Sequence, residues 1–172
     1  MSILSADIRA KIDHWLLRYP PEQKRSGVLE ALRFVQEEHG WLSEELMDAV
    51  ADYLQLPKIA VYEVATFYNL YNLKPVGRHT ISVCTNISCM LRGSEEILEH
   101  LKKRLDVDIN GTTKDGKCTL KEVECLGACI GAPMFQLDKK YYEHLTPEKV
   151  DEILALLIDD RFAHRRPSPI NL

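Results

Sequence analysis

Cysteines are the residues of this chain whose type and spacing point most directly to chemistry. Four of the five cysteines form two close pairs, Cys84 with Cys89 and Cys125 with Cys129. An odd count cannot pair completely into disulfides, and five cysteines in 172 residues are too few for a disulfide scaffold. The sequence shows no secretory signal, so we expect a reducing compartment, where paired thiols more often bind metal or do redox work.

Four thiolates in two pairs suit an iron–sulfur cluster or a zinc ion. A [2Fe-2S] cluster has two irons that each take two thiolates, so we assign one pair to each iron. Reduction makes such a site more negative, which favours backbone N–H donors and few carboxylates nearby. Gly127 and Gly131 allow the second loop to turn its amides toward sulfur, and Arg92 would offset charge. Segments 85–91 and 126–137 contain no Asp or Glu.

Zinc and a redox dithiol are the alternatives to a cluster. Structural zinc sites usually have short spacings between paired ligands, and C-x4-C is at the edge of that range. The chain has neither the C-x-x-C of thioredoxin-type redox sites nor the C-x4-C-x2-C run of plant-type ferredoxins. The spacing therefore favours a cluster of another ferredoxin class. We interpret Cys118, the fifth cysteine, as a buried apolar residue and not as a ligand.

The elements expected around the cysteines alternate strands with helices. Segment 79–84 alternates in polarity and predicts a strand ending at Cys84, and 119–125 predicts a second strand ending at Cys125. A sheet would therefore bring both cysteine loops to one edge. The other expected elements are a helix over 94–105, a hairpin over 134–145 and a last helix that begins at Pro147. This order fits a mixed sheet with helices packed on it, and a thioredoxin-like arrangement is one solution.

The first 75 residues contain no cysteine and predict a helical bundle. Apolar residues recur there at helical spacing, Ser5 and Ser43 are expected N-caps, and Gly40 is expected to end a helix. The aromatic, uncharged segment 66–73 (TFYNLYNL) is interpreted as core, with a partner surface as the alternative. The pattern breaks at Lys74, which gives three expected regions. They are a helical domain over 1–75, a cysteine-bearing domain over 76–158 and a loose C-terminal tail over 159–172.

Composition and missing motifs exclude several other functions. A net charge of −4 argues against nucleic acid as a partner. No apolar run is long enough to span a bilayer, so direct membrane insertion is not expected. The six histidines are scattered, and no Gly-rich phosphate loop is present. We therefore expect no nucleotide or flavin site on this chain.

Two segments resemble the 24-kilodalton [2Fe-2S] subunit family of NADH:quinone oxidoreductase, the E-type subunit of respiratory complex I. Segment 61–98 combines VATFY with C-x4-C-M-L-R-G, and segment 119–154 contains ECLGAC-x-x-AP. The helical first half, including 39–54, is also similar to the family's N-terminal domain. The resemblance implies an α+β chain, with an N-terminal helical bundle followed by a thioredoxin-like [2Fe-2S] ferredoxin domain.

The resemblance implies specific ligands and partners. It implies that Cys84, Cys89, Cys125 and Cys129 bind one [2Fe-2S] cluster, since each occupies its motif position. The implied partner is the larger flavin subunit, which binds FMN and NADH and exchanges single electrons with the cluster within the peripheral arm of the complex. This chain alone is not expected to oxidise NADH. Cys118 departs from the family, which usually has Phe there, and this leaves the ligand set intact.

The same resemblance implies a location in the cell. Two alternatives to a function in complex I remain. We expect the chain on the cytoplasmic side of the bacterial inner membrane, held there through the complex. Diaphorase modules of NAD-dependent hydrogenases and formate dehydrogenases use similar subunits, so an equivalent role in one of them is the first alternative. A zinc-stabilised interaction module is the second.

Overall fold

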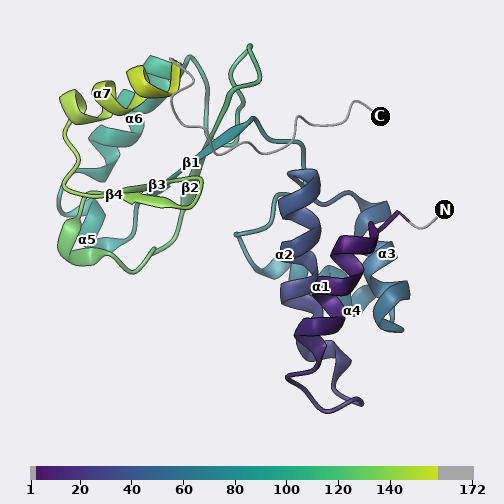
Figure 1. The fold of residues 1–172 in the computed structure, drawn as a ribbon. Helices are drawn as coiled ribbons and strands as arrows, with labels where there is room; N and C mark the ends of the chain where they lie inside the picture. The colour runs from purple at the N-terminus through teal and green to yellow at the C-terminus, as the bar shows by residue number, and fades with distance from the viewer. Residues whose placement is uncertain (1–2, 159–172) are drawn as a thin grey trace. The chain divides into compact units, whose positions relative to one another are not determined.

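The computed structural model describes residues 3–158 and divides the chain into two compact units, one up to Pro75 and one from Val76 (Figure 1). Each unit has its own apolar core. Among the described residues, no helix is both long and apolar enough to cross a bilayer. Residues 159–172, the expected loose tail, lie outside the described residues.

The first unit is helical, as the sequence predicts. Its elements are α1 (Ala6–Leu16), the short 3-10 helix η1 (Lys24–Gly27), α2 (Val28–His39), α3 (Glu44–Leu54) and α4 (Lys58–Phe67). The expected caps are present, because Ser5 accepts from the amide of Ile8 and Ser43 accepts from the amide of Leu46. Gly40 ends α2 in the left-handed region at φ 84°, a conformation that costs glycine little.

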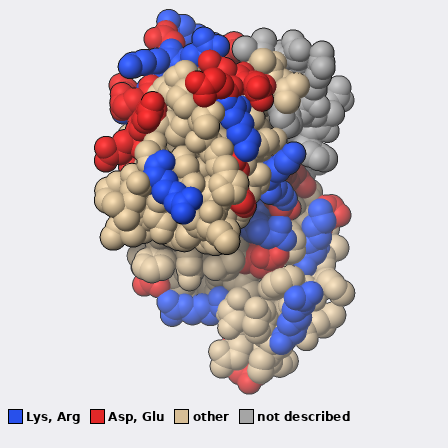
Figure 2. Space-filling model, turned by 90° about the vertical axis from the view of Figure 1, so that its left-hand side faces the viewer, with Lys and Arg blue, Asp and Glu red and all other residues tan. Residues whose placement is uncertain are grey.

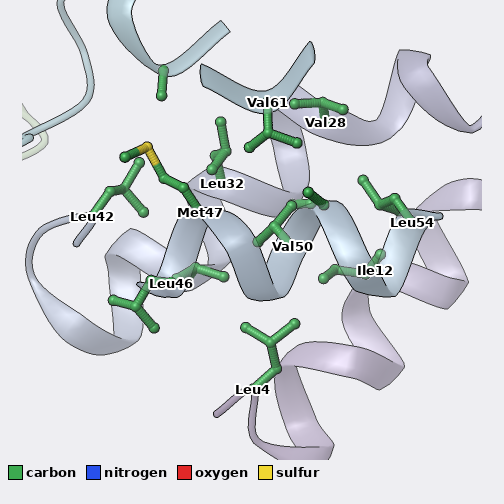
Figure 3. Close-up of a cluster of buried hydrophobic side chains, with 14 of the residues drawn as sticks. Leu4, Ile12, Val28, Leu32, Leu42, Leu46, Met47, Val50, Leu54 and Val61 are labelled. Carbon is green, nitrogen blue, oxygen red and sulfur yellow. The ribbon is translucent and has the colours of Figure 1, made fainter. Parts of the chain in front are cut away.

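The core of the first unit is made by the apolar face of each helix. Figure 3 shows side chains from all four helices and their connections pointing toward one another. The labelled members are Leu4, Ile12, Val28, Leu32, Leu42, Leu46, Met47, Val50, Leu54 and Val61. All of these side chains are buried, and each large one contributes about 1.5–3 kcal/mol when removed from water.

Segment 66–73 is interpreted from the sequence as core, and the structure shows that most of it is exposed. Tyr71 is buried, and its hydroxyl donates to the carbonyl of Leu29 at 2.6 Å. Phe67, by contrast, is 76% exposed. Tyr68, Leu70 and Leu73 are also exposed. Tyr68, Leu70 and Leu73 follow the end of α4, so no helical period turns them inward, and the prediction of core is wrong for most of the segment.

The second unit is a four-stranded mixed sheet with helices. Its strands are β1 (His79–Cys84), β2 (Cys118–Val123), β3 (Phe135–Leu137) and β4 (Lys140–Tyr142), in the spatial order β2-β1-β3-β4. β1 is parallel to β2, whereas β3 is antiparallel to both β1 and β4. The helices are α5 (Ile87–Met90), α6 (Ser94–Leu105), the 3-10 helix η2 (Cys129–Gly131) and α7 (Pro147–Ile158). The mixed sheet and its helices agree with the expected thioredoxin-like arrangement.

α6 and α7 pack together on one face of the sheet (Figure 1). On that face Ile81 of β1 is flanked in register by Leu120 of β2 and Leu137 of β3. Leu101 of α6 and Ile153 of α7 belong to the same buried cluster. This core fixes the sheet from one side, so the carboxyl ends of β1 and β2 have defined positions.

The second strand differs from its expected span of 119–125. β2 begins at Cys118 and ends at Val123, because its ladder with β1 ends where Cys84 pairs with Val123. Cys125 therefore lies in the loop beyond the strand. Cys118 pairs with His79 at the other end of the ladder and is buried in the sheet–helix core. This confirms its interpretation as a buried apolar residue.

Candidate metal centre

The first cysteine pair is part of the folded core. Cys84 is the last residue of β1 and Cys89 lies in α5, and each side chain is 2% exposed. Asn86 caps α5, because its side-chain oxygen accepts from the amide of Ile87 at 2.9 Å. The turn of α5 returns the chain so that the two thiols interact. Burial, aided by hydrogen bonding with Cys84, raises the pKa of the Cys89 thiol to about 11.

The second cysteine pair lies in an exposed loop. Cys125 follows β2 and Cys129 opens η2, and their Sγ atoms are 3.5 Å apart. Gly127, at φ 83°, directs its amide to Cys125 Sγ at 3.4 Å. This hydrogen bond, followed by that with Cys129, lowers the pKa of the Cys125 thiol. The expected role of Gly127 is confirmed.

The two pairs lie within reach of each other. Cys84 interacts with Cys89 in its own pair and with Cys125 across the pairs, and Cys89 interacts with Cys129. Within residues 3–158, no three His, Cys, Asp or Glu side chains form a group that could hold a metal ion. Each iron of a [2Fe-2S] cluster takes only two protein thiolates, so a group of three ligands around one metal is not needed and two thiol pairs within reach of each other fit such a cluster.

Gly131 has a different role from the expected one. Its amide donates to the carbonyl of Ala128 and does not turn to sulfur. A Cβ atom at this position would lie only 2.6 Å from Cβ of Glu143. The residue therefore permits the segment after β4 to pack closely against the second cysteine loop, where His144 donates its amide to the Gly131 carbonyl at 2.6 Å.

Three side-chain hydrogen bonds at the site were not expected from the sequence. Asn86 Nδ2 donates to Glu124 Oε2 at 2.7 Å, and Thr85 Oγ1 donates to Glu122 Oε1 at 2.7 Å. On the other side, Tyr141 Oη donates to the carbonyl of Leu126 at 2.9 Å. Asn before a helical turn is a recognisable cap signal, but nothing in the sequence identifies the partners across the two loops. Carboxylates thus lie near the site although the loops themselves contain none.

Exposed apolar side chains flank Cys89 and Cys129 in the chain. Ile87, Met90 and Leu91 lie in or next to α5, and Ile130, between Cys129 and Gly131, is 87% exposed. Figure 2 views the molecule from the side on which α5 lies and shows a broad area dominated by uncharged side chains. Grouped apolar exposure of this kind is typical of a surface that binds another protein.

The fold and the donor set together define the class, an iron–sulfur protein with a thioredoxin-like sheet in which β1 and β2 each lead into a segment that carries a thiol pair. The comparison with known families agrees, because the model of the thioredoxin-like [2Fe-2S] ferredoxin family matches residues 12–157. The chain belongs to this family, and its cofactor is one [2Fe-2S] cluster.

Curated relatives extend the similarity over most of the chain. The E subunit of NADH-quinone oxidoreductase from Rickettsia bellii (strain RML369-C) is 47% identical over 144 residues, which cover 83% of this chain and 86% of that protein. The second E-type NADH-quinone oxidoreductase subunit of Rhizobium meliloti (strain 1021) is 42% identical over 147 residues, 86% of each chain.

Among solved structures, a chain of an NAD+-reducing [NiFe]-hydrogenase in the air-oxidized state has a similar fold. The TM-score is 0.68 at 18% sequence identity, and the match covers 78% of this chain. The matched region is only 23% of the hydrogenase chain. This likeness therefore supports the fold.

Proposed function

We propose that this chain is an electron-transfer subunit of the NADH dehydrogenase module of respiratory complex I. The observation that carries this proposal is the 47% identity to a protein named as the E subunit of NADH-quinone oxidoreductase. The 144 matched residues exceed the length of either unit, so the similarity includes the helical bundle as well as the cysteine-bearing unit. The chain is thus one subunit of an oxidoreductase, and NADH oxidation by this chain alone is not expected.

The proposal assigns four ligands. Cys84 and Cys89 bind one iron, and Cys125 and Cys129 bind the other. When bound, a [2Fe-2S] cluster supplies one-electron transfer, here with the FMN of the partner subunit. The chain's own residues hold the thiols in two pairs, and the amide of Gly127 stabilises negative charge on Cys125 Sγ.

The proposal also assigns a separate function to each region of the chain. Residues 1–75 form a helical docking domain and residues 76–158 form the cluster domain, while residues 159–172 are assigned no role in the site. The separate apolar cores of the two units support this division.

The proposed partner at the cysteines is the subunit that binds FMN and NADH. Ile87, Leu91 and Ile130 support this, because exposed apolar side chains beside a redox site exclude water when a protein surface covers them. Exposed Phe67 and Leu70 in the helical unit support a second contact within the peripheral arm. The chain is then held on the cytoplasmic side of the bacterial inner membrane through the complex.

An equivalent subunit of an NAD-dependent hydrogenase or formate dehydrogenase is the main competing function. The hydrogenase likeness rests on fold at 18% identity, whereas the two NADH-quinone oxidoreductase relatives exceed 40%. Purification of the native complex through a tag on this chain distinguishes the two. A flavin subunit found with quinone-reducing membrane subunits supports complex I, and one found with a nickel or formate-oxidising subunit contradicts it.

The cofactor is tested by anaerobic purification of the full chain. We expect iron and acid-labile sulfide in equal amounts, two of each per chain, with an electron paramagnetic resonance signal on reduction. Stoichiometric zinc without iron or sulfide would contradict the proposed function and support a zinc-stabilised interaction module.

A further inference from the structure

The two cysteine loops separate where the β1–β2 ladder ends. Cys84 pairs with Val123, and Thr85 still donates its amide to the Val123 carbonyl at 3.3 Å. Beyond this point, Cys89 and Cys125 are carried by separate segments. Their spacing depends on interactions that join these two segments.

Asn86 joins the two segments with one side chain. Its Oδ1 accepts from the amide of Ile87 at 2.9 Å, which fixes the first turn of the helix that carries Cys89. Its Nδ2 donates to Glu124 Oε2 at 2.7 Å, immediately before Cys125. The same amide group therefore acts on both ligand pairs.

The orientation of the Asn86 amide is fixed by its two partners. A backbone N–H can only donate, and an ionised carboxylate can only accept. The oxygen of Asn86 must therefore face Ile87 and its nitrogen must face Glu124, since the flipped amide would lose both hydrogen bonds. Both side chains are exposed, and the carboxylate acceptor makes this hydrogen bond charge-assisted.

We propose that Asn86 is a positioning residue that sets the distance between the two cysteine pairs by linking the start of α5 to Glu124. This inference rests on the proposed ligand set and adds a residue to it. In this role Asn86 acts through the segments that carry Cys89 and Cys125. Aspartate at this position would keep the cap on Ile87 and lose the donor to Glu124.

An isosteric exchange of the two partners tests this role in the full, cluster-loaded chain. In Asn86→Asp two carboxylates face each other, and we expect the cluster to be lost to an iron chelator about three- to tenfold faster than in the wild type. Adding Glu124→Gln to that variant restores a donor and an acceptor with reversed polarity and the same net charge. We expect the double variant to return to within about twofold of the wild-type rate.

Two single variants that each remove one negative charge are the matched controls for Asn86→Asp. Glu124→Gln alone keeps an acceptor for Asn86, so the rate of cluster loss stays within about twofold while the reduction potential rises, because one negative charge is removed. Glu122→Gln removes a charge of the same sign from a residue bonded to Thr85, and its rate of cluster loss should also stay near the wild-type value.

Adding Glu122→Gln to Asn86→Asp restores the net charge but supplies no donor for residue 86, so continued fast cluster loss in that control separates this role from a purely electrostatic one. An Asn86→Asp variant that keeps its cluster as long as the wild type overturns the proposal, and so does a double variant that loses it as fast as Asn86→Asp. Recovery of both the rate and the reduction potential in the double variant supports it. A wild-type chain that binds no iron and sulfide would instead contradict the proposed function, so the two failures are distinguishable.

Discussion

The two cysteine pairs of this site are held in opposite ways. Cys84 and Cys89 are buried and are carried by a strand end and a capped helical turn. Cys125 and Cys129 are exposed and lie in a loop whose path depends on glycine. One half of the site is thus part of the folded core, and the other half is shaped by local backbone geometry.

The thiol pKa values reflect the same difference. Burial raises the pKa of Cys89, whereas an amide hydrogen bond from Gly127 lowers the pKa of Cys125. Changes at the first pair should therefore affect the stability of the domain as well as the cluster. Changes at the second pair should affect mainly the cluster and the local loop.

The largest expected effect comes from replacing one ligand in each pair. Cys89→Ser and Cys125→Ser should each destabilise the cluster and change its optical spectrum, because each replaces a proposed thiolate ligand with a hydroxyl, a weaker ligand for iron. In the metal-free chain the two should differ, since Cys89→Ser buries a hydroxyl and lowers the free energy of unfolding by about 1–3 kcal/mol. Cys125→Ser, at an exposed position, should change it by less than about 0.5 kcal/mol. Urea unfolding of both metal-free variants measures the difference, and equal destabilisation would contradict the comparison.

The next largest effect is expected at Gly131. Glycine is needed there because close packing leaves no room for a Cβ atom, and not because the backbone conformation favours glycine. An alanine Cβ would lie 2.6 Å from Cβ and from Cδ of Glu143, so the backbone near β4 must move. We expect Gly131→Ala to lower the free energy of unfolding by about 1–3 kcal/mol, as overpacking commonly does. Thermal unfolding of the metal-free chain is the measurement, and an unchanged midpoint would show that the segment after β4 moves away at no cost.

The sequence predicts the elements whose signals are local. The span of β1, the caps at Ser5 and Ser43, and the sulfur-directed amide of Gly127 follow from residues that are close in the chain. The convergence of the cysteine loops also follows, because parallel neighbouring strands end at the same edge. These features need no knowledge of distant partners.

The features that the sequence misses depend on distant residues. Asn86 and Glu124 are 38 positions apart, and no local pattern pairs them. The close approach of Glu143 to Gly131 is likewise set by how β4 packs. The exposure of Tyr68 and Leu70 escapes prediction because apolar composition indicates burial, whereas both residues follow the end of α4 and no longer share its helical period.

Gly127 should show a smaller effect, of conformational origin. No atom lies within 4 Å of a Cβ built there, but its φ of 83° is strained for any residue with a Cβ. We expect Gly127→Ala to lower the free energy of unfolding by about 1 kcal/mol and to hasten cluster loss, because the amide that faces Cys125 is displaced. Chelator-induced bleaching of the loaded chain measures the second effect. Gly116→Ala, also at positive φ and without a neighbour within 4 Å, is the matched control outside the site. Equal bleaching in both would indicate general strain.

Cys118 should show the smallest effect on the site, although it is buried like the first pair. It lies in the sheet–helix core at the far end of the β1–β2 ladder, and burial followed by the charge of Asp138 raises its pKa to about 12. At pH 8 its thiol is therefore almost entirely protonated and enclosed. In the folded metal-free chain, iodoacetamide should modify Cys125 and Cys129 and leave Cys118 unmodified until the chain unfolds, as mass spectrometry of the peptides would show. Cys118→Ala should leave the cluster spectrum and reduction potential unchanged, and a shifted spectrum would mean that burial alone does not separate this cysteine from the ligands.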